Sequence, residues 1–138
     1  MTADDIIRAA RAVIGTRFRH QGRDPAKGLD CAGLIVHVAR ELDMAHDDMA
    51  VYPRLPGGGL LESTLDGQPQ LDVVKGGLEA GDILLMRFGG DPQHLAILTA
   101  DNTIVHAWAI ARKVCEHDLT DEWRRRIVRA YRFRGVEA

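Results

Sequence analysis

Residues 94–108 have the sequence HLAILTADNTIVHAW, which predicts a β-hairpin. Two apolar runs, 94–99 and 103–108, flank the polar residues 100–102, a pattern typical of two antiparallel strands and their turn. With this three-residue loop, the numbers of facing residues add up to 202, and His94 and His106 become diagonal neighbours on one face. A two-residue loop would put them on opposite faces, so the shared face requires a loop of odd length or a β-bulge.

Upstream of this hairpin the apolar residues follow a helical period. One stripe runs through residues 2–14, and a second runs through residues 31–42, where Asp30 can cap the helix. The polar, glycine-containing residues 16–29 predict a loop. Between the second helix and the first strand, we expect one short helix, near residues 60–65.

Further short apolar runs surround the hairpin, at 82–88, 112–117 and 127–133. Their spacing predicts an antiparallel meander that includes the hairpin. Because the helices precede the strands, the expected fold class is α+β, with N-terminal helices packed on one side of a C-terminal antiparallel sheet.

Length and composition indicate one globular domain over residues 1–138. The chain has 138 residues, of which 46% are apolar and 28% charged, which excludes a disordered chain. No apolar run reaches the roughly 18 residues of a membrane span. The first five residues lack the basic and apolar regions of a secretory signal, so we expect synthesis in the cytoplasm without a signal peptide.

Positive charge is concentrated near the C-terminus, where residues 112–134 hold eight bases and four acids. Nucleic-acid binding is one interpretation, and a final strand with a solvated basic face is the other. We expect no nucleic-acid partner, because no recognition helix, RNP motif or zinc motif accompanies the charge. Cys115 and His117 are too few for a zinc site, so no metal is expected.

Cys31 is a candidate nucleophile because it would occupy the first turn of the second helix. The helix N-terminus stabilises negative charge, and it can lower the pKa of a thiol there. The small residues Ala32 and Gly33 leave space beside the sulfur. The alternative is a buried cysteine that acts as a small apolar residue.

A nucleophilic cysteine needs a base, which in turn needs an orienting group. His94 and His106 differ from the other histidines because each lies in an otherwise apolar strand, and the hairpin can place both on one face. The alternative is two core histidines hydrogen-bonded to the backbone. His20 lies in the first loop, within reach of a cleft, and His117, between Glu116 and Asp118, is expected to form a surface ion pair.

Four segments resemble the successive motifs of NlpC/P60 cysteine peptidases. They are Asp30-Cys31-Ala32-Gly33-Leu34, Gly81-Asp82-Ile83-Leu84-Leu85, His94-Leu95-Ala96-Ile97-Leu98 and Ile104-Val105-His106-Ala107. The opening Ile14-Gly15-Thr16 and the close, Trp123-Arg124-Arg125-Arg126-Ile127 through Tyr131-Arg132-Phe133, are similar to a narrower branch of cell-wall peptidases that are encoded with the tail genes of phages and gene transfer agents.

The resemblance implies a papain-like α+β fold and a hydrolase that needs no cofactor. Cys31 would be the nucleophile, His94 the general base and His106 the residue that orients His94. The implied substrate is the peptidoglycan stem peptide, cut between γ-D-glutamate and the diamino acid. The implied partners are phage-like tail proteins, and the particle would carry the enzyme from the cytoplasm to the cell wall.

The expected substrate-binding residues are Asp30, Phe18, His20 and Trp108. Many relatives have a tyrosine near the place of Phe18, so a hydroxyl is missing here, and His20 is the candidate to replace it. Trp108 either lines the cleft or belongs to the core. Two other functions remain open, an inactive structural tail-tip protein with the same fold and an amidase or acyltransferase that acts on another substrate.

Overall fold

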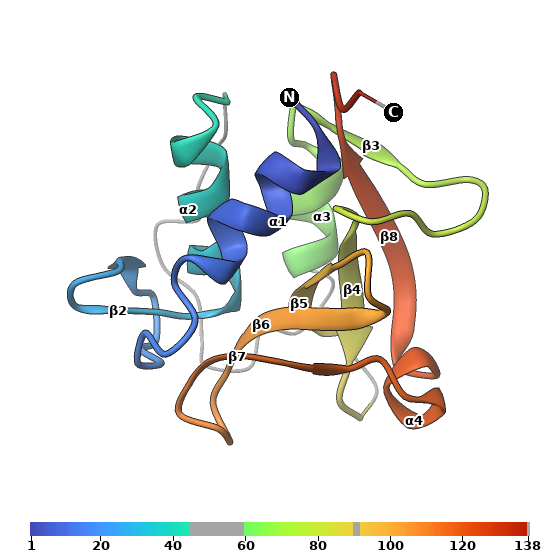
Figure 1. Ribbon diagram of the computed structural model, residues 1–138. Coiled ribbons are helices and arrows are strands. Elements are labelled where there is room, and N and C mark those ends of the chain that lie inside the picture. The colour runs from blue at the N-terminus through green and yellow to red at the C-terminus, as the bar shows by residue number, and fades with distance from the viewer. Residues whose placement is uncertain (45–59, 90–91, 138) are drawn as a thin grey trace.

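A six-stranded antiparallel sheet forms the centre of the computed structural model, which describes residues 1–44, 60–89 and 92–137 (Figure 1). In space the strands follow the order β3-β8-β4-β5-β6-β7. The strands are β3 (Leu71–Val73), β4 (Ile83–Arg87), β5 (Pro92–Leu98), β6 (Thr103–Trp108), β7 (Lys113–Asp118) and β8 (Ile127–Phe133).

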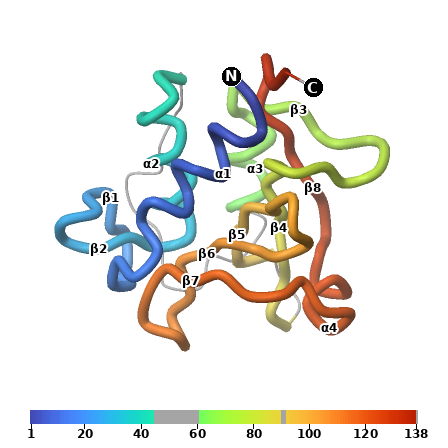
Figure 2. Tube along the Cα trace, in the orientation of Figure 1, coloured from blue at the N-terminus to red at the C-terminus, as the bar shows by residue number. Residues whose placement is uncertain are grey.

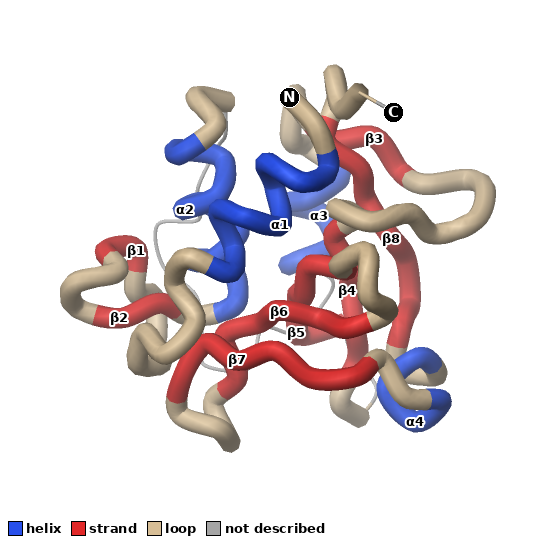
Figure 3. The backbone as a smooth tube through the Cα atoms, viewed as in Figure 1, coloured by secondary structure: helices blue, strands red, loops and turns tan. Residues whose placement is uncertain are grey.

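Three helices lie together on one side of these strands (Figure 3). They are α1 (Ala3–Arg11), α2 (Cys31–Glu41) and α3 (Leu60–Asp66). Ile6 of α1 and Leu34 of α2 are fully buried in one apolar cluster with Ile97 and Val105 of the sheet. This packing confirms the predicted α+β class and the position of the helices on the sheet. No helix in the described part of the chain has the length and apolar character to cross a membrane.

The other face of the sheet carries a second apolar cluster. It contains Ala96, Leu98 and Ile104, which alternate along β5 and β6 with the residues that face the helices. Leu119 and Trp123, from the segment between β7 and β8, pack against this cluster. The helix α4 (Asp121–Arg124) belongs to that segment and was not predicted. The sheet is therefore covered on both faces, and β5 and β6 bury side chains on each.

The predicted meander is correct for β4, β5, β6 and β7 and wrong for β8, which lies between β3 and β4. Tyr131 and Phe133 of β8 face the helices, while Ala130 belongs to the second cluster. A strand with buried side chains on both faces is stabilised most in the interior of a sheet, whereas the more exposed β7 stays at the edge. The return of β8 also brings the two chain ends together, where Glu137 N donates to Met1 O over 2.8 Å (Figure 2).

The helix predicted over residues 2–14 ends at Arg11, and Gly15 follows with a φ of +94°. The segment predicted as a loop contains a small hairpin of β1 (Arg23–Asp24) and β2 (Gly28–Leu29). Strand β3 was also missed. Strands of two or three residues are too short to show an alternating pattern, so periodicity alone cannot detect them.

Residues 15–18 run along the outer edge of β7. Gly15 N donates to Val114 O over 2.9 Å, and Phe18 N donates to Arg112 O over 2.9 Å. These bonds occupy backbone groups of an edge strand. They also fix the position of Phe18 relative to the sheet.

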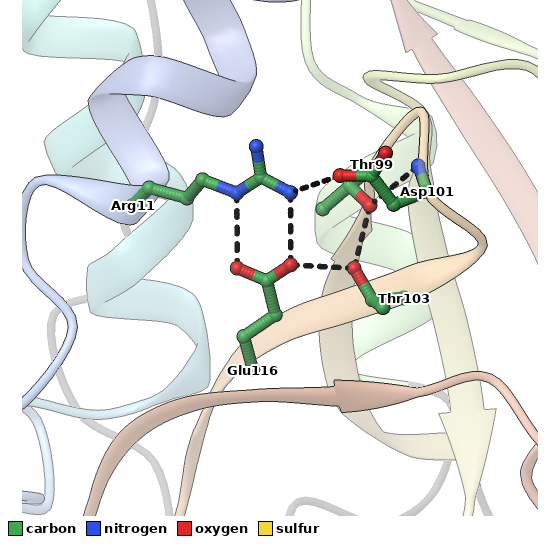
Figure 4. Close-up of polar contacts among 5 residues, drawn as sticks. All are labelled: Arg11, Thr99, Asp101, Thr103 and Glu116. Carbon is green, nitrogen blue, oxygen red and sulfur yellow. Dashed lines mark hydrogen bonds and ion pairs between the residues drawn. The ribbon is translucent and has the colours of Figure 1, made fainter.

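A polar network joins α1 to the hairpin of β5 and β6 and to β7 (Figure 4). The Arg11 guanidinium donates to both carboxylate oxygens of Glu116, each over 2.9 Å, and to Asp101 over 2.9 Å. Thr103 donates to Glu116 over 2.6 Å. The bidentate pair fixes the Glu116 side chain on the helix-facing side of β7.

The basic residues of β8 are paired with acids rather than simply solvated. Arg132 makes two hydrogen bonds, of 2.8 and 2.9 Å, to the fully buried carboxylate of Asp82. Arg129 pairs with Asp66 at 3.2 Å, and Arg134 pairs with Asp72 at 2.9 Å. Much of the positive charge predicted for a solvated face thus joins β8 to α3, to β3 and to the start of β4.

Candidate active site

The N-terminus of α2 begins with Cys31, as the sequence predicts. Asp30, a residue that is 3% exposed, caps the helix because its carboxylate accepts a hydrogen bond from Gly33 N over 2.7 Å. The same carboxylate accepts from Gln21 N over 2.8 Å and pairs with Arg23 over 2.9 Å. Asp30 therefore holds the loop before β1 against the start of the helix that carries the thiol.

Gly33 allows this loop to approach the helix. A Cβ atom at Gly33 would collide with the backbone carbonyl of Gly22, which lies directly against it. The sequence predicts that the small residues Ala32 and Gly33 leave space beside the sulfur. At Gly33 the space is filled instead by a protein loop.

The predicted register of the hairpin is confirmed. Ile97 faces Val105 and Leu98 faces Ile104, so both pairs add up to 202. His94 and His106 consequently share a face, and His94 Nε2 lies 2.5 Å from His106 Nδ1. The contact between these two rings is the one that the predicted register implies.

A third histidine extends the pair. His117 Nε2 lies 2.8 Å from His106 Nε2, and His117 Nδ1 lies 3.0 Å from the backbone oxygen of Asp118. The predicted surface ion pair of His117 is therefore wrong. The signal that could have found it is the same diagonal rule, because His106 faces Cys115 across β6 and β7, and His117 is two residues further along.

Aromatic side chains enclose the three imidazoles. Trp108 stacks on His106 with ring centroids 5.5 Å apart and planes 21° apart. Trp123 meets His106 edge-on at 5.2 Å and lies 4.9 Å from His117, and Phe88 lies 5.2 Å from His94. This surrounding excludes water, and His94 and His106 are 6% and 0% exposed.

Burial determines the protonation of the two inner histidines. Loss of hydration lowers the pKa of His94 to about 3, with a smaller effect from the charge of His117. Loss of hydration lowers the pKa of His106 to about 2, with smaller effects from the charges of His94 and His117. Both imidazoles are therefore neutral at pH 7.

The thiol of Cys31 does not have the lowered pKa that its place on the helix predicts. Burial and, to a smaller extent, the nearby negative charge of Asp30 raise the pKa of Cys31 to about 12. Hydrogen bonds from the backbone of Leu95 and Ala32 act in the opposite direction but are weaker. Desolvation outweighs the helix N-terminus here, because the hydration free energy that a buried thiolate loses exceeds the electrostatic stabilisation that the first turn of the helix provides.

A pocket of about 260 Å³ opens at Cys31. His94 lines it together with all four residues predicted to bind substrate, namely Phe18, His20, Asp30 and Trp108. The remaining lining residues are Ala32, Leu61, Phe88, Gln93, Ala107, Ala109 and Ile110. Trp108 thus lines the pocket and stacks on His106; it is half-buried and belongs to neither apolar cluster, so the cleft interpretation is the correct one.

The pocket contains the groups that a thiol-dependent acyl transfer needs. Cys31 and His94 line the same cavity, and the N-terminus of α2 lies beside them. Among residues 1–44, 60–89 and 92–137, no group of three or more His, Cys, Asp or Glu side chains is arranged to hold a metal ion.

Comparison with solved structures reveals the same fold in several proteins. An NlpC/P60 family protein from Bacillus cereus has a TM-score of 0.70 and 21% identity, over 96% of this chain and 40% of that one. The NlpC/p60 domain of the peptidoglycan hydrolase SagA has a TM-score of 0.64 and 22% identity, over 94% and 97%. The peptidoglycan hydrolase RipB from Mycobacterium tuberculosis has a TM-score of 0.63 and 18% identity, over 99% and 65%.

The chain thus spans less than half of the Bacillus cereus protein and nearly all of the SagA domain. No curated protein matches it. The model of the NlpC/P60 family matches residues 15–132, which include Cys31, His94 and His106. This match covers most of the chain, and the chain therefore belongs to the NlpC/P60 family.

Proposed function

We propose that the chain is a cysteine peptidase that hydrolyses the peptide stems of peptidoglycan. The observation that carries the proposal is the pocket shared by the Cys31 thiol and the His94 imidazole, with His106 hydrogen-bonded to the far side of that imidazole. Membership of the NlpC/P60 family supports it, as do the similar folds of SagA and RipB, which are peptidoglycan hydrolases.

In the proposed reaction, Cys31 is the nucleophile and His94 the general base. His94 Nε2 is engaged with His106, so Nδ1 is the nitrogen that accepts the thiol proton. The sulfur attacks the scissile carbonyl, and the backbone N–H of Cys31 at the start of α2 stabilises the oxyanion. The C–N bond then breaks, and His94 returns its proton to the leaving amine. Water, deprotonated by His94, then attacks the thioester carbonyl; the C–S bond breaks to release the acid product, and His94 returns the proton to the sulfur.

Because Cys31 and His94 are both neutral in the resting enzyme, the thiolate forms during the reaction and is not present beforehand. The Cys31 thiol and the His94 imidazole are both uncharged at pH 7, because burial penalises each charge separately. When the proton moves from sulfur to nitrogen, the two charges form together, and their attraction in the desolvated pocket offsets part of that penalty. Substrate that fills the pocket and excludes water strengthens this attraction.

We infer that the bond cut lies between γ-D-glutamate and the diamino acid, and that the enzyme belongs to the phage-type branch of the family. The segments at Ile14-Gly15-Thr16 and from Trp123 to Phe133 support this branch. A phage-like tail would then carry the protein from the cytoplasm, where it is made, to the cell wall. Tail proteins are the proposed partners of this form.

Phe18 favours the second candidate, an inactive structural protein of the tail tip. It lines the pocket in the region where many relatives have a tyrosine, so it supplies no hydroxyl to an oxyanion or a substrate. His20, which lines the same pocket, is the candidate to supply a hydrogen bond in its place.

Digestion of purified sacculi tests the proposal. We expect the wild-type protein to release muropeptides, and mass spectrometry of the products identifies the bond. Cys31→Ala should reduce release to background without a change in thermal stability, because only the nucleophile is lost. Cys115→Ala is the matched control, because it removes the other cysteine and should retain activity.

The outcomes separate the candidates. Release of muropeptides by Cys31→Ala would exclude the thiol mechanism. A folded wild-type protein that releases nothing would favour the structural role. Products cut at another amide bond would identify an amidase, and products with a new acyl linkage would identify an acyltransferase.

A further inference from the structure

Three histidines from three adjacent strands form a chain of hydrogen bonds that ends on the backbone. His94 of β5 contacts His106 of β6, His106 contacts His117 of β7, and His117 contacts the carbonyl oxygen of Asp118. The catalytic roles proposed above account for the first two rings. They leave His117 without a role, although it lies 2.8 Å from His106.

The final contact determines the direction of the whole chain. A carbonyl oxygen only accepts hydrogen bonds, so His117 Nδ1 must carry a proton. When His117 is neutral, this proton is its one N–H, so His117 Nε2 is an acceptor and His106 Nε2 is the donor to it. By the same rule, His106 Nδ1 accepts from His94 Nε2. The lone pair of His94 is then on Nδ1, the nitrogen that must take the thiol proton.

Without His117 as an acceptor for His106 Nε2, either ring could be the donor in the hydrogen bond between His94 and His106. The bond between His94 Nε2 and His106 Nδ1 forms equally well with the proton on either nitrogen. If His106 Nδ1 held the proton, His94 would carry its own proton on Nδ1 and could not act as a base. An acceptor for His106 Nε2 removes this second arrangement.

The fold holds this outer end in place. Asp118 faces Thr103 in the last pair of β6 and β7, and Leu119 N donates to Asn102 O over 3.0 Å just beyond it. Trp123 packs on the His117 ring at 4.9 Å. On the opposite face of β7, the Arg11 pair fixes the adjacent Glu116 (Figure 4).

We propose that His117 is a positioning residue. Its Nδ1 donates to the Asp118 carbonyl oxygen and its Nε2 accepts the proton of His106 Nε2, which keeps the lone pair of His94 on Nδ1. The proposal rests on His94 acting as the base. It assigns to His117 no contact with substrate and no proton transfer during the reaction.

Two substitutions separate the acceptor at position 117 from the volume of the side chain. His117→Leu removes the acceptor, so His106 Nε2–H loses its partner and the reversed arrangement becomes populated. We expect kcat to fall by roughly ten- to a hundredfold, with KM unchanged. His117→Gln keeps an amide oxygen that can accept from His106 Nε2, and it should recover most of kcat. A thermal unfolding curve for each variant accounts for losses that come from stability.

Nitrogen-15 NMR of histidine-labelled protein reads the protonated nitrogen of each ring directly. In the wild-type protein we expect the proton on Nε2 of His94, on Nε2 of His106 and on Nδ1 of His117. In His117→Leu, the His106 signals should shift toward the Nδ1–H form, while His117→Gln should keep the wild-type pattern. Asp118→Asn should also keep the pattern, because the acceptor is the backbone carbonyl and not the carboxylate.

The NMR readout does not depend on catalysis, so it separates this inference from the proposed function. The wild-type pattern in a protein that hydrolyses nothing would support the positioning role and contradict the peptidase. A His106 proton on Nδ1 in the wild-type protein would overturn the positioning role, as would a His117→Leu variant with unchanged His106 signals.

Discussion

Cys31 illustrates how two local effects compete at one residue. Its place in the first turn of α2 favours the thiolate, and the sequence alone suggests a lowered pKa. Burial and the charge of Asp30 act in the opposite direction and raise the pKa of Cys31 to about 12. The nucleophile of the proposed reaction is therefore a thiol that loses its proton to His94 when substrate is bound.

The raised pKa makes a prediction about alkylation. In a Cys115→Ala background, where Cys31 is the remaining cysteine, the rate of reaction with iodoacetamide should rise about tenfold per pH unit between pH 7 and pH 10, because only the thiolate reacts. The corresponding rate for Cys115, measured in a Cys31→Ala background, should exceed that of Cys31 at pH 7. A plateau in the Cys31 profile near neutral pH would instead reveal a preformed pair of thiolate and imidazolium.

The histidines show which residues a sequence can assign. His94 and His106 were identified because they interrupt apolar strands and fall on one face at the predicted register. His117 was missed because its acidic neighbours suggested a solvated ion pair, although the diagonal rule applies equally to the hairpin of β6 and β7. For His117, the register of β6 and β7 predicts the contacts of the side chain correctly, whereas the charges of its sequence neighbours do not.

At the scale of elements, the contact between α2 and the loop before β1 depends on glycine. Gly33 lies inside a helix, where alanine would ordinarily stabilise the helix by about 1 kcal/mol. The carbonyl of Gly22 occupies the place of its missing Cβ atom. The loop and the helix are held together by Asp30, so neither can move away without loss of those hydrogen bonds.

We therefore predict that Gly33→Ala destabilises the protein, by about 1–3 kcal/mol, because the clash outweighs the gain in helix propensity. Urea denaturation measures the change in the free energy of unfolding. Gly76→Ala is a suitable control, because a Cβ atom there meets nothing within 4 Å, and its stability should be unchanged or slightly higher. A Gly33→Ala variant that is more stable than the wild type would contradict the packing described.

At the scale of the whole molecule, the covered sheet keeps two histidines neutral inside the protein. Both have a pKa well below 6.5 in the folded state, whereas the unfolded chain restores the ordinary value. As the pH falls below 6.5, the unfolded state binds protons that the folded state cannot. The contribution of these two histidines to the free energy of unfolding is therefore fully present above pH 6.5 and is lost progressively as the pH falls toward 3.

Between pH 7 and pH 5, we predict that the free energy of unfolding falls by about 2 kcal/mol for each of His94 and His106. Urea denaturation at pH 7, 6 and 5 measures this loss, in a range that lies mostly above the titration of carboxyl groups. His106→Gln should show about half of the wild-type dependence, because one of the two groups is absent. Equal stability at pH 7 and pH 5 would show that the two rings take up protons in the folded protein as readily as in the unfolded chain.

The sequence alone determined the fold class and the pair His94 and His106, because both follow from short-range periodicity. Strand alternation fixes faces, and the length of one turn fixes register. The cap of α2 by Asp30 is likewise a local property, and the prediction was correct.

Only the tertiary structure decided where β8 lies, how burial sets the pKa of Cys31, and that His117 completes the chain of imidazoles. Each of these depends on segments far apart in the sequence that exclude water from one another. Strand β8 lies between β3 and β4 because side chains on both of its faces are buried. The pKa of Cys31 is raised because the thiolate would lose its hydration in the pocket. Neither quantity is a property of a local pattern, because desolvation is the sum of contacts made by the whole fold.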